Sequence, residues 1–191
     1  MGPMGPMGPA GAQGAQGLQG PQGLTGAQGA QGPQGIKGDK GDRGLSEIAY
    51  IRDERASGVM GGSCTAGSWL TRDLSVLGGD TSFISLASNR FVLQPGTYFI
   101  EVSAPAFSVN SHQAKLKVIE TNADVILGST AYAGTTSITS SIIAGEIVVA
   151  AASTFEIQHR CATTRSISGF GIAGGFGNNE IFTQVKIIKK Q

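Results

Sequence analysis

The sequence predicts a protein in two parts: a triple-helical stalk over residues 1–46 and an all-β sandwich over residues 47–191, with three chains assembled together. Three observations lead to this prediction. Glycine occupies every third position from Gly2 to Gly44, short stretches of alternating apolar and polar residues fill the rest of the chain, and turn-forming residues separate those stretches. The first observation predicts the stalk, and the other two predict the sandwich.

The period of three in the first 46 residues has a specific physical cause. In the collagen triple helix three polyproline-II chains wind together, and only glycine fits at the crowded axis. A flexible glycine-rich linker, which is the alternative, does not need this period. Proline fills the second position of five triplets and never the third, where animal collagens carry hydroxyproline. This usage is typical of a collagen from a bacterium or a virus.

The charges of the stalk gather at its C-terminal end, in the stretch KGDKGDRG. Lys37 precedes Asp39 and Lys40 precedes Asp42, a spacing that lets a lysine of one chain pair with an aspartate of a staggered neighbour. Each exposed pair contributes only ~0.2–1 kcal/mol, but three chains repeat every pair. We predict that these ion pairs set the register of the stalk, and the alternative is that they only keep it soluble.

The segment 47–191 is long enough to form one domain with its own core. It holds eleven of the fourteen Lys and Arg residues and eleven of the thirteen acidic residues, so its formal charges balance. It has neither a basic stripe that would indicate nucleic-acid binding nor an apolar run long enough to cross a membrane. The sequence therefore predicts no nucleic-acid partner and no membrane insertion.

Period-two alternation predicts the strands of this domain. After an opening strand at 47–55, we expect strands over 68–76, 81–87, 90–93, 96–104, 112–120, 124–132, 136–149, 154–161 and 180–188. Turn signals such as LGGD, QPG and GNN lie between them, and no stretch keeps a helical period over three turns. Many short strands with frequent turns predict a sandwich of the jelly-roll type.

The two parts constrain each other. A collagen stalk is obligately trimeric, and a short triple helix without hydroxyproline is marginal unless a folded domain aligns its chains. We therefore predict a homotrimer in which residues 47–191 hold the three chains in register.

Several stretches of the domain resemble known proteins. LQPGTYFIEVSA and IIAGEIVVAAASTFEIQ resemble regions of the complement-type and tumour-necrosis-factor-like trimeric jelly rolls. SAPAFSVNSHQAKL, FEIQHRCATT and GFGIAGGFGNNEIFTQVKI resemble the C-terminal knob of collagen-containing tail-fibre proteins of tailed bacteriophages and prophages, and the resemblance covers 48–190. It implies a structural, adhesive protein of the virion that joins other fibre components on the N-terminal side of the stalk.

No catalytic motif is recognisable in the chain. It lacks the G-x-S-x-G, H-E-x-x-H and phosphate-loop patterns, and its two histidines, His112 and His159, lie in unrelated stretches. The acidic residues that could pair for glycan hydrolysis all read as solvent-facing strand positions: Asp53, Glu101, Glu120, Glu146 and Glu156. We therefore predict that the protein is not an enzyme and uses no cofactor or metal.

The order of the strands predicts where a receptor would bind. In the family that the domain resembles, both termini lie at one end, so alternating strand directions place the loops 56–67, 105–111, 132–136 and 162–179 at the other end. Long loops on a rigid scaffold are common binding sites. The alternatives are that these loops only cap the sandwich, or that the binding face lies on the flanks between subunits. The residues predicted to bind a host-surface glycan or protein are Phe107, Asn110, Ser111, Tyr132, Thr163, Thr164, Arg165, Asn178 and Asn179.

The two cysteines, Cys64 and Cys161, are too few for a disulfide framework and lack the close spacing of a zinc site. The same strand count places both at the loop-bearing end, so a disulfide is geometrically allowed. Two unpaired thiols are the alternative.

The function that the resemblance implies is that of a trimeric phage tail-fibre tip, located in the virion. A bacterial surface or spore-coat collagen-like protein, with a structural or adhesive role, is the alternative. A glycan depolymerase is disfavoured, because such fibres usually need a larger catalytic body than residues 47–191 provide.

Overall fold

The computed structural model describes residues 1–31 and 47–190. The chain divides into two units, Met1–Gly41 and Asp42–Gln191. The predicted ion pairs of Lys37 with Asp39 and of Lys40 with Asp42 lie outside the described residues, as does the predicted domain boundary at residue 46.

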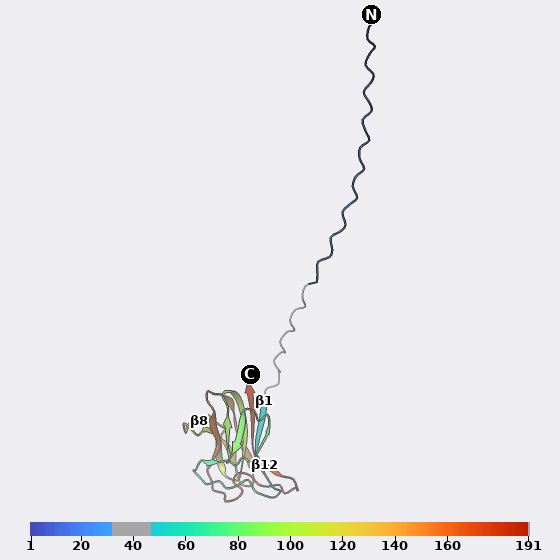
Figure 1. Cartoon of the computed structure of the whole chain (residues 1–191). Coiled ribbons are helices and arrows are strands. Elements are labelled where there is room, and N and C mark those ends of the chain that lie inside the picture. The colour runs from blue at the N-terminus through green and yellow to red at the C-terminus, as the bar shows by residue number, and fades with distance from the viewer. Residues whose placement is uncertain (32–46, 191) are drawn as a thin grey trace. The chain divides into compact units, whose positions relative to one another are not determined.

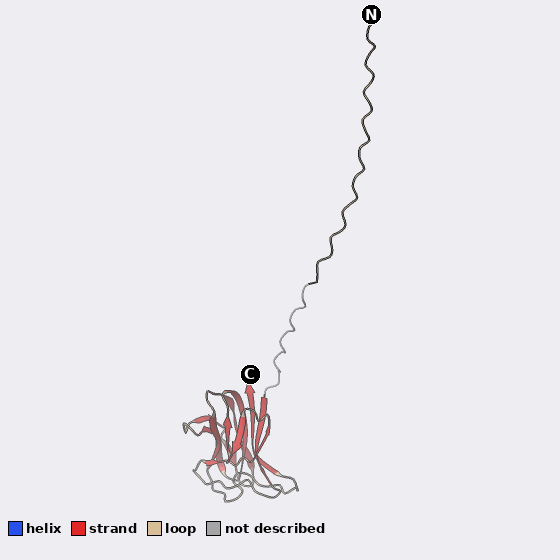
Figure 2. Cartoon of the chain, viewed as in Figure 1, coloured by secondary structure: helices blue, strands red, loops and turns tan. Residues whose placement is uncertain are grey.

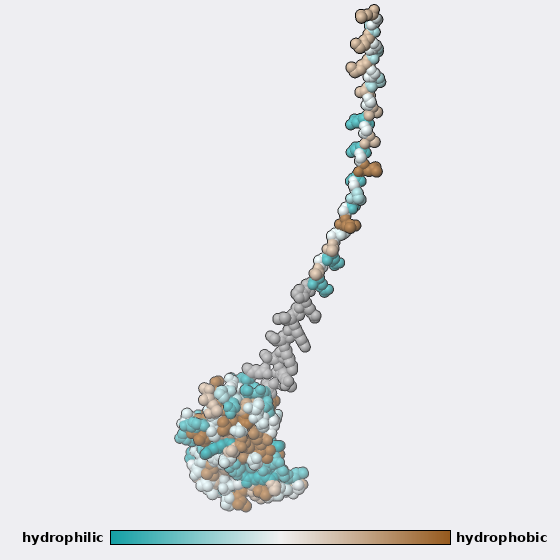
Figure 3. Space-filling view, in the orientation of Figure 1, coloured by the Kyte–Doolittle hydropathy of each residue, from teal (hydrophilic) through white to brown (hydrophobic). Residues whose placement is uncertain are grey.

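Residues 1–31 are exposed along their whole length and contain no helix or strand. Figure 3 shows their apolar side chains as isolated spots with no continuous apolar surface. A Cβ atom built on Gly23 or Gly29 meets no atom of the described chain within 4 Å. Nothing in the described part of the chain therefore requires glycine at these positions, whereas the predicted triple helix does require it at its axis.

The regular elements of residues 47–190 are all strands (Figure 2). No helix in the described part of the chain could serve as a membrane span. The strands are β1 Glu47–Arg55, β2 Leu70–Thr71, β3 Val76–Gly79, β4 Ile84–Ala87, β5 Arg90–Leu93, β6 Gly96–Phe107, β7 Asn110–Val118, β8 Asp124–Leu127, β9 Ala131–Ala133, β10 Ile138–Val149, β11 Ser153–Cys161 and β12 Glu180–Lys190.

The strands form two antiparallel sheets (Figure 1). The first sheet has the order β10-β6-β12-β1-β3, and the second has the order β4-β5-β11-β7-β8, with β2 added to β11 and β9 added to β7. The long strands β6, β7, β10, β11 and β12 alternate between the two sheets as the chain proceeds. This alternation is the arrangement of a jelly roll. The predicted all-β sandwich is confirmed.

Apolar side chains from both sheets fill the space between them. Along β6, Ile100 and Val102 are fully buried, while Glu101 between them is exposed. Leu116 of β7 and Ile157 of β11 belong to the same buried cluster, although they come from the other sheet. Each such side chain contributes roughly 1.5–3 kcal/mol by leaving water. The period-two pattern of the sequence therefore records which side of each strand faces the core.

Two predicted strands are shorter than the sequence suggested. In 68–76, β2 pairs with β11 of the second sheet and β3 pairs with β1 of the first, so the residues between them cross from one sheet to the other. In 124–132, the strand is interrupted at Gly128, and the segment forms two shorter strands, β8 and β9. A Cβ atom on Gly128 would lie 2.7 Å from Ser141 Oγ, so the main chain approaches β10 too closely for a side chain.

The long loops gather at one end of the sandwich. Glu47 pairs with Lys189, so the first strand begins where the last strand ends. The opposite ends of the strands are marked by the pairing of Phe107 with Ile138. The segments 56–69, 108–109, 134–137 and 162–179 lie at that opposite end, which we call the loop end (Figure 1). The strand directions are those predicted from the sequence.

Candidate functional site

The loop end is held together by main-chain hydrogen bonds between segments far apart in the sequence. The N–H of Cys64 donates to the carbonyl of Arg165, and the N–H of Arg165 donates back to the carbonyl of Cys64. The N–H of Thr163 donates to the carbonyl of Val109 over 3.0 Å. The loops therefore form one connected surface with fixed mutual positions.

A disulfide joins Cys64 to Cys161, whose Cα atoms lie 6.4 Å apart. Next to it, Ala66 forms a β-bridge with Cys161, and the N–H of Gly67 donates to the carbonyl of Cys161 over 2.9 Å. Of the two alternatives that the sequence left open, the structure has the disulfide. It fixes the segment that leads to Trp69 against the end of β11.

Most of the residues predicted to bind a receptor lie close together at this end. Asn110 Nδ2 donates to Thr163 Oγ1 over 2.9 Å. The Ala66 N–H, two residues after Cys64, donates to Thr164 Oγ1. Ser111 pairs with Tyr132 across β7 and β9, and 63% of Tyr132 is exposed.

The remaining predicted residues have different surroundings. Phe107 is half-buried at the end of β6, where its N–H donates to the Gly169 carbonyl in the loop 162–179. Arg165 Nε donates to the Ser108 carbonyl over 3.0 Å, so its guanidinium already serves to hold two loops together. Asn179 Nδ2 donates to Glu54 Oε1 over 2.8 Å. Asn178 and Asn179 therefore sit over the end of β1, in a separate part of the loop end.

The loop that carries Asn178 and Asn179 is organised by Glu180. Its carboxylate accepts the N–H groups of Gly175, Gly174 and Gly58, and these hydrogen bonds lower the pKa of Glu180. Phe176 projects from the same loop with 89% of its surface exposed.

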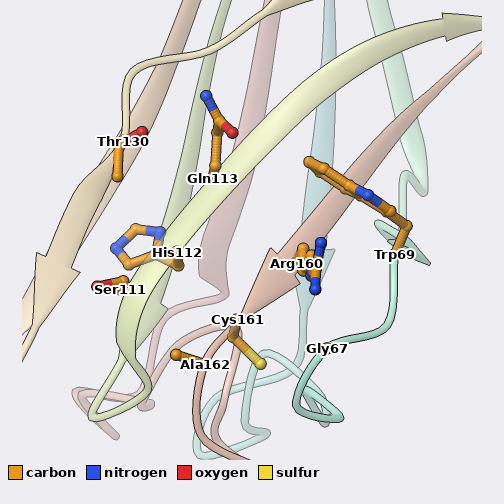
Figure 4. A pocket seen from close by; sticks show the side chains of 9 residues that line it. All are labelled: Gly67, Trp69, Ser111, His112, Gln113, Thr130, Arg160, Cys161 and Ala162. Carbon is orange, nitrogen blue, oxygen red and sulfur yellow. The ribbon is translucent and has the colours of Figure 1, made fainter.

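A pocket with a volume of about 470 Å³ opens on the outer face of the second sheet, next to the loop end (Figure 4). Gln113 of β7 and Arg160 of β11 are a cross-strand pair, and the buried residues on either side of them point to the core. Gln113 and Arg160 therefore point outward. The residues that line the pocket are Gly67, Trp69, Ser111, His112, Gln113, Thr130, Arg160, Cys161 and Ala162.

Contacts around the pocket hold its wall in place. Lys115 Nζ lies 4.1 Å from the centre of the Trp69 ring and forms an ion pair with Asp124 over 2.8 Å. Gln113 Nε2 donates to the Gly128 carbonyl, which leaves Gln113 Oε1 free to accept. Of the residues that line the pocket, only Ser111 was predicted from the sequence to bind a receptor, and Cys161 was predicted only as a possible disulfide partner. The single tryptophan of the chain was a usable signal, as was the alternation that places Gln113 on an outer face.

Two acidic residues are buried, against prediction. Asp53 is 2% exposed and Glu156 is 3% exposed, although both were expected to face solvent. Glu156 lies under the side chains of Thr71 and Arg90, both of which donate to its carboxylate. Asp53 lies beside Arg55, and burial raises the pKa of Asp53 while Arg55 partly offsets this effect. Glu156 is therefore buried because other side chains cover it, whereas Asp53 follows Ala49 and Ile51 on the inward side of β1, so the side predicted for Asp53 was wrong.

Arg72 is fully buried beneath the loop end, and its side chain connects the first sheet to the loop 162–179. Its Nε donates to Thr183 Oγ1 over 2.7 Å, its Nη1 to the Pro105 carbonyl over 3.1 Å, and its Nη2 to the Phe170 carbonyl over 3.2 Å. The guanidinium carbon also lies 4.2 Å from the centre of the Phe170 ring. Burial lowers the pKa of Arg72, and arginine nevertheless stays charged at neutral pH.

The two histidines meet in the core beside Arg72. His112 Nδ1 lies 2.9 Å from His159 Nε2, and His112 Nε2 lies 2.8 Å from Thr139 Oγ1. Burial, with a further effect from the charge of Arg72, lowers the pKa of His112 to about 4 and that of His159 to about 2. Both rings are therefore neutral at pH 7. Within the described residues no group of three or more His, Cys, Asp and Glu side chains could hold a metal ion.

We expect the domain to lose stability as the pH falls from about 6.5 toward 4. Because the pKa of His112 is lower in the folded state, the unfolded chain binds more protons in this interval, and stability rises with pH there. The expected loss for His112 alone is about 3 kcal/mol. Denaturant midpoints at several pH values measure it. The His112→Gln variant should show a shallower pH dependence, and equal slopes for the variant and the parent would contradict the prediction.

Comparisons with known proteins give a family match for the N-terminal part of the chain. Residues 1–47 match the family model described as Collagen triple helix repeat (20 copies). No curated protein matches the sequence. Among solved structures, murine APRIL at pH 5.0 has a TM-score of 0.47 and 7% identity, over 76% of this chain and 99% of that chain.

Two further solved structures are similar to the same extent. The globular domain of zebrafish complement 1qA has a TM-score of 0.43 and 8% identity, over 72% of this chain and 94% of that one. Eiger TNF from S. frugiperda has a TM-score of 0.48 and 12% identity, over 77% of this chain and 94% of that one. The chain thus joins a collagen repeat, as predicted, to an all-β sandwich.

Proposed function

We propose that this protein is the tip of a trimeric viral fibre of the kind that tailed phages carry, and that its knob binds a glycan or protein on the surface of a host cell. One observation carries the proposal: a collagen repeat continues in the same chain into a sandwich that the chain enters at Glu47, at the opposite end from its long loops. A fibre tethered through its N-terminal stalk would offer such loops to a cell.

The homotrimer is part of the proposal. On the outer face of the first sheet, the paired residues Phe99 of β6 and Ile188 of β12 lie between Tyr50 of β1 and Val148 of β10, which are 45% and 76% exposed. Apolar surface of this kind on a soluble protein marks an interaction site. We infer that further copies of the chain pack on this face, which aligns three stalks and leaves the second sheet and the loop end accessible.

Three identical loop ends make weak individual sites sufficient. Linked sites act at a high effective concentration, so the avidity of a trimer can exceed the affinity of one knob by about 10²–10⁴-fold. The exposed polar and aromatic side chains at this end, such as Asn110 and Tyr132, suit a glycan or a polar protein surface. Other fibre components would attach on the N-terminal side of the stalk.

The test uses the full chain and host-cell binding. We expect a trimer by sedimentation, and we expect Tyr132→Ala combined with Asn110→Ala to weaken cell binding at least about tenfold, as loss of interface anchors does. Thr121→Ala, an exposed change in the turn between β7 and β8 at the opposite end, is the matched control. A monomeric chain would contradict the trimer. If the Tyr132→Ala/Asn110→Ala variant binds cells like the parent, the binding face lies on the flanks between subunits and not at the loop end.

Localisation separates the two functions predicted from the sequence. We expect antibodies against the knob to label purified virions at their fibres. Labelling of a bacterial envelope or spore coat in the absence of virions would instead support a bacterial surface collagen.

A further inference from the structure

We propose that the pocket on the outer face of the second sheet binds a carboxylate-bearing sugar, such as a hexuronic or nonulosonic acid unit of an acidic surface polysaccharide. This inference deepens the proposed receptor-binding function and rests on it for its biological role. Sugar binding itself can be measured without a host cell.

The charge of the pocket points to an anion. Arg160 is exposed on β11, and none of the ion pairs among the described residues involves it. No Asp or Glu side chain lines the pocket, and His112 in its wall is neutral at pH 7 because burial lowers its pKa. Lys115, which lies over the Trp69 ring, is already paired with Asp124. The Arg160 guanidinium is therefore a free fork of donors, which matches the two oxygens of a carboxylate.

The remaining wall suits the body of a sugar. Trp69 lines one side, and an indole ring offers a flat apolar surface that the C–H groups of a pyranose can cover. Ser111 and Thr130 contribute hydroxyl groups, and Gln113 keeps a free amide oxygen. A concave site with an aromatic wall and a few polar groups is typical of small-ligand sites, and its volume of about 470 Å³ is in the usual range.

The wall is also preorganised. The Cys64–Cys161 disulfide and the hydrogen bond from the Gly67 N–H to the Cys161 carbonyl fix the segment before Trp69. The Lys115 ammonium over the indole ring holds the side chain itself. A ligand would therefore find the aromatic wall and the guanidinium in place, so little ordering would oppose binding.

The experiment measures binding of simple sugars to the full-length protein by saturation-transfer NMR and calorimetry. The probes are sodium glucuronate, sodium galacturonate and sodium N-acetylneuraminate, with glucose, galactose and glucose 6-phosphate for comparison. We expect at least one of the three carboxylates to bind about tenfold more tightly than the neutral sugars, because its carboxylate pairs with the guanidinium group of Arg160.

Variants locate the binding. Arg160→Gln should reduce the affinity for the carboxylate sugar to that of its neutral analogue, and Trp69→Ala should weaken both. Lys117→Gln, an outward-facing change further along β7 and outside the pocket, should leave both unchanged. Arg160 is exposed, so its replacement should not unfold the domain, and a melting curve checks this.

Three results would overturn the inference: no preference for any carboxylate over the neutral sugars, tighter binding of glucose 6-phosphate than of every carboxylate, or full affinity in Arg160→Gln. If the parent protein still binds host cells while these sugars fail, the pocket assignment falls and the proposed function stands. If the sugars bind as expected but the protein binds no host cell, the pocket assignment stands and the proposed function falls.

Discussion

Replacing Arg72 with methionine is expected to lower the free energy of unfolding of the knob by about 3–5 kcal/mol, which is a large part of the stability of an ordinary domain. The side chain is fully buried and makes three hydrogen bonds, to Thr183, Pro105 and Phe170. Its loss leaves these acceptors without a partner in a place that water does not reach. It also removes the positive charge that faces the buried carboxylate of Asp53.

The measurement is a guanidinium chloride unfolding curve at a fixed protomer concentration, since assembly contributes to the apparent stability. Arg160→Met is the matched control, because Arg160 is the same residue type in an exposed position and should change stability by no more than about 0.5 kcal/mol. Arg72→Lys should also be strongly destabilised, since one ammonium cannot replace the planar fork. An Arg72→Met midpoint equal to that of Arg160→Met would show that the buried guanidinium has no net role.

Removing the disulfide is expected to have the other large effect. The Cys64→Ser/Cys161→Ser double variant should lose about 4 kcal/mol, because the bond closes a long loop, with 97 residues of sequence separation, in the unfolded chain. The double variant avoids an unpaired thiol. We also expect faster hydrogen exchange at Gly67, whose N–H bonds to the Cys161 carbonyl.

Reduction provides the control for this prediction. A reducing agent should destabilise the parent by the same amount and should leave the double variant unchanged. The prediction is wrong if the double variant unfolds at the same denaturant concentration as the oxidised parent, or if reduction shifts both proteins equally.

The candidate binding surface could be predicted only in part. Alternating strand directions were enough to place Asn110, Tyr132 and Thr163 at one end of the sandwich, and the structure has them there. The strand directions did not predict that the Arg165 guanidinium donates a hydrogen bond to the Ser108 carbonyl. The strand count specifies the end of the molecule at which a loop lies, whereas side-chain contacts depend on the path of each loop.

The pocket, too, could not be predicted from the strand pattern alone. The sequence pattern puts Gln113 and Arg160 on outward positions of two separate strands, but only the register of β7 with β11 makes them neighbours. Trp69 reaches them because β2, which directly follows it, pairs with β11, in a segment that the alternation misread as one longer strand.

The sequence by itself determined the collagen repeat and the all-β class of the knob. These features follow from periods of three and two, and a period depends on residues close together in the chain. Only the tertiary structure decided the burial of Arg72, Asp53 and Glu156, the contact of His112 with His159, and the pocket. Each of these depends on which distant segment covers a given side chain, and that is settled by packing between sheets and loops rather than by local pattern.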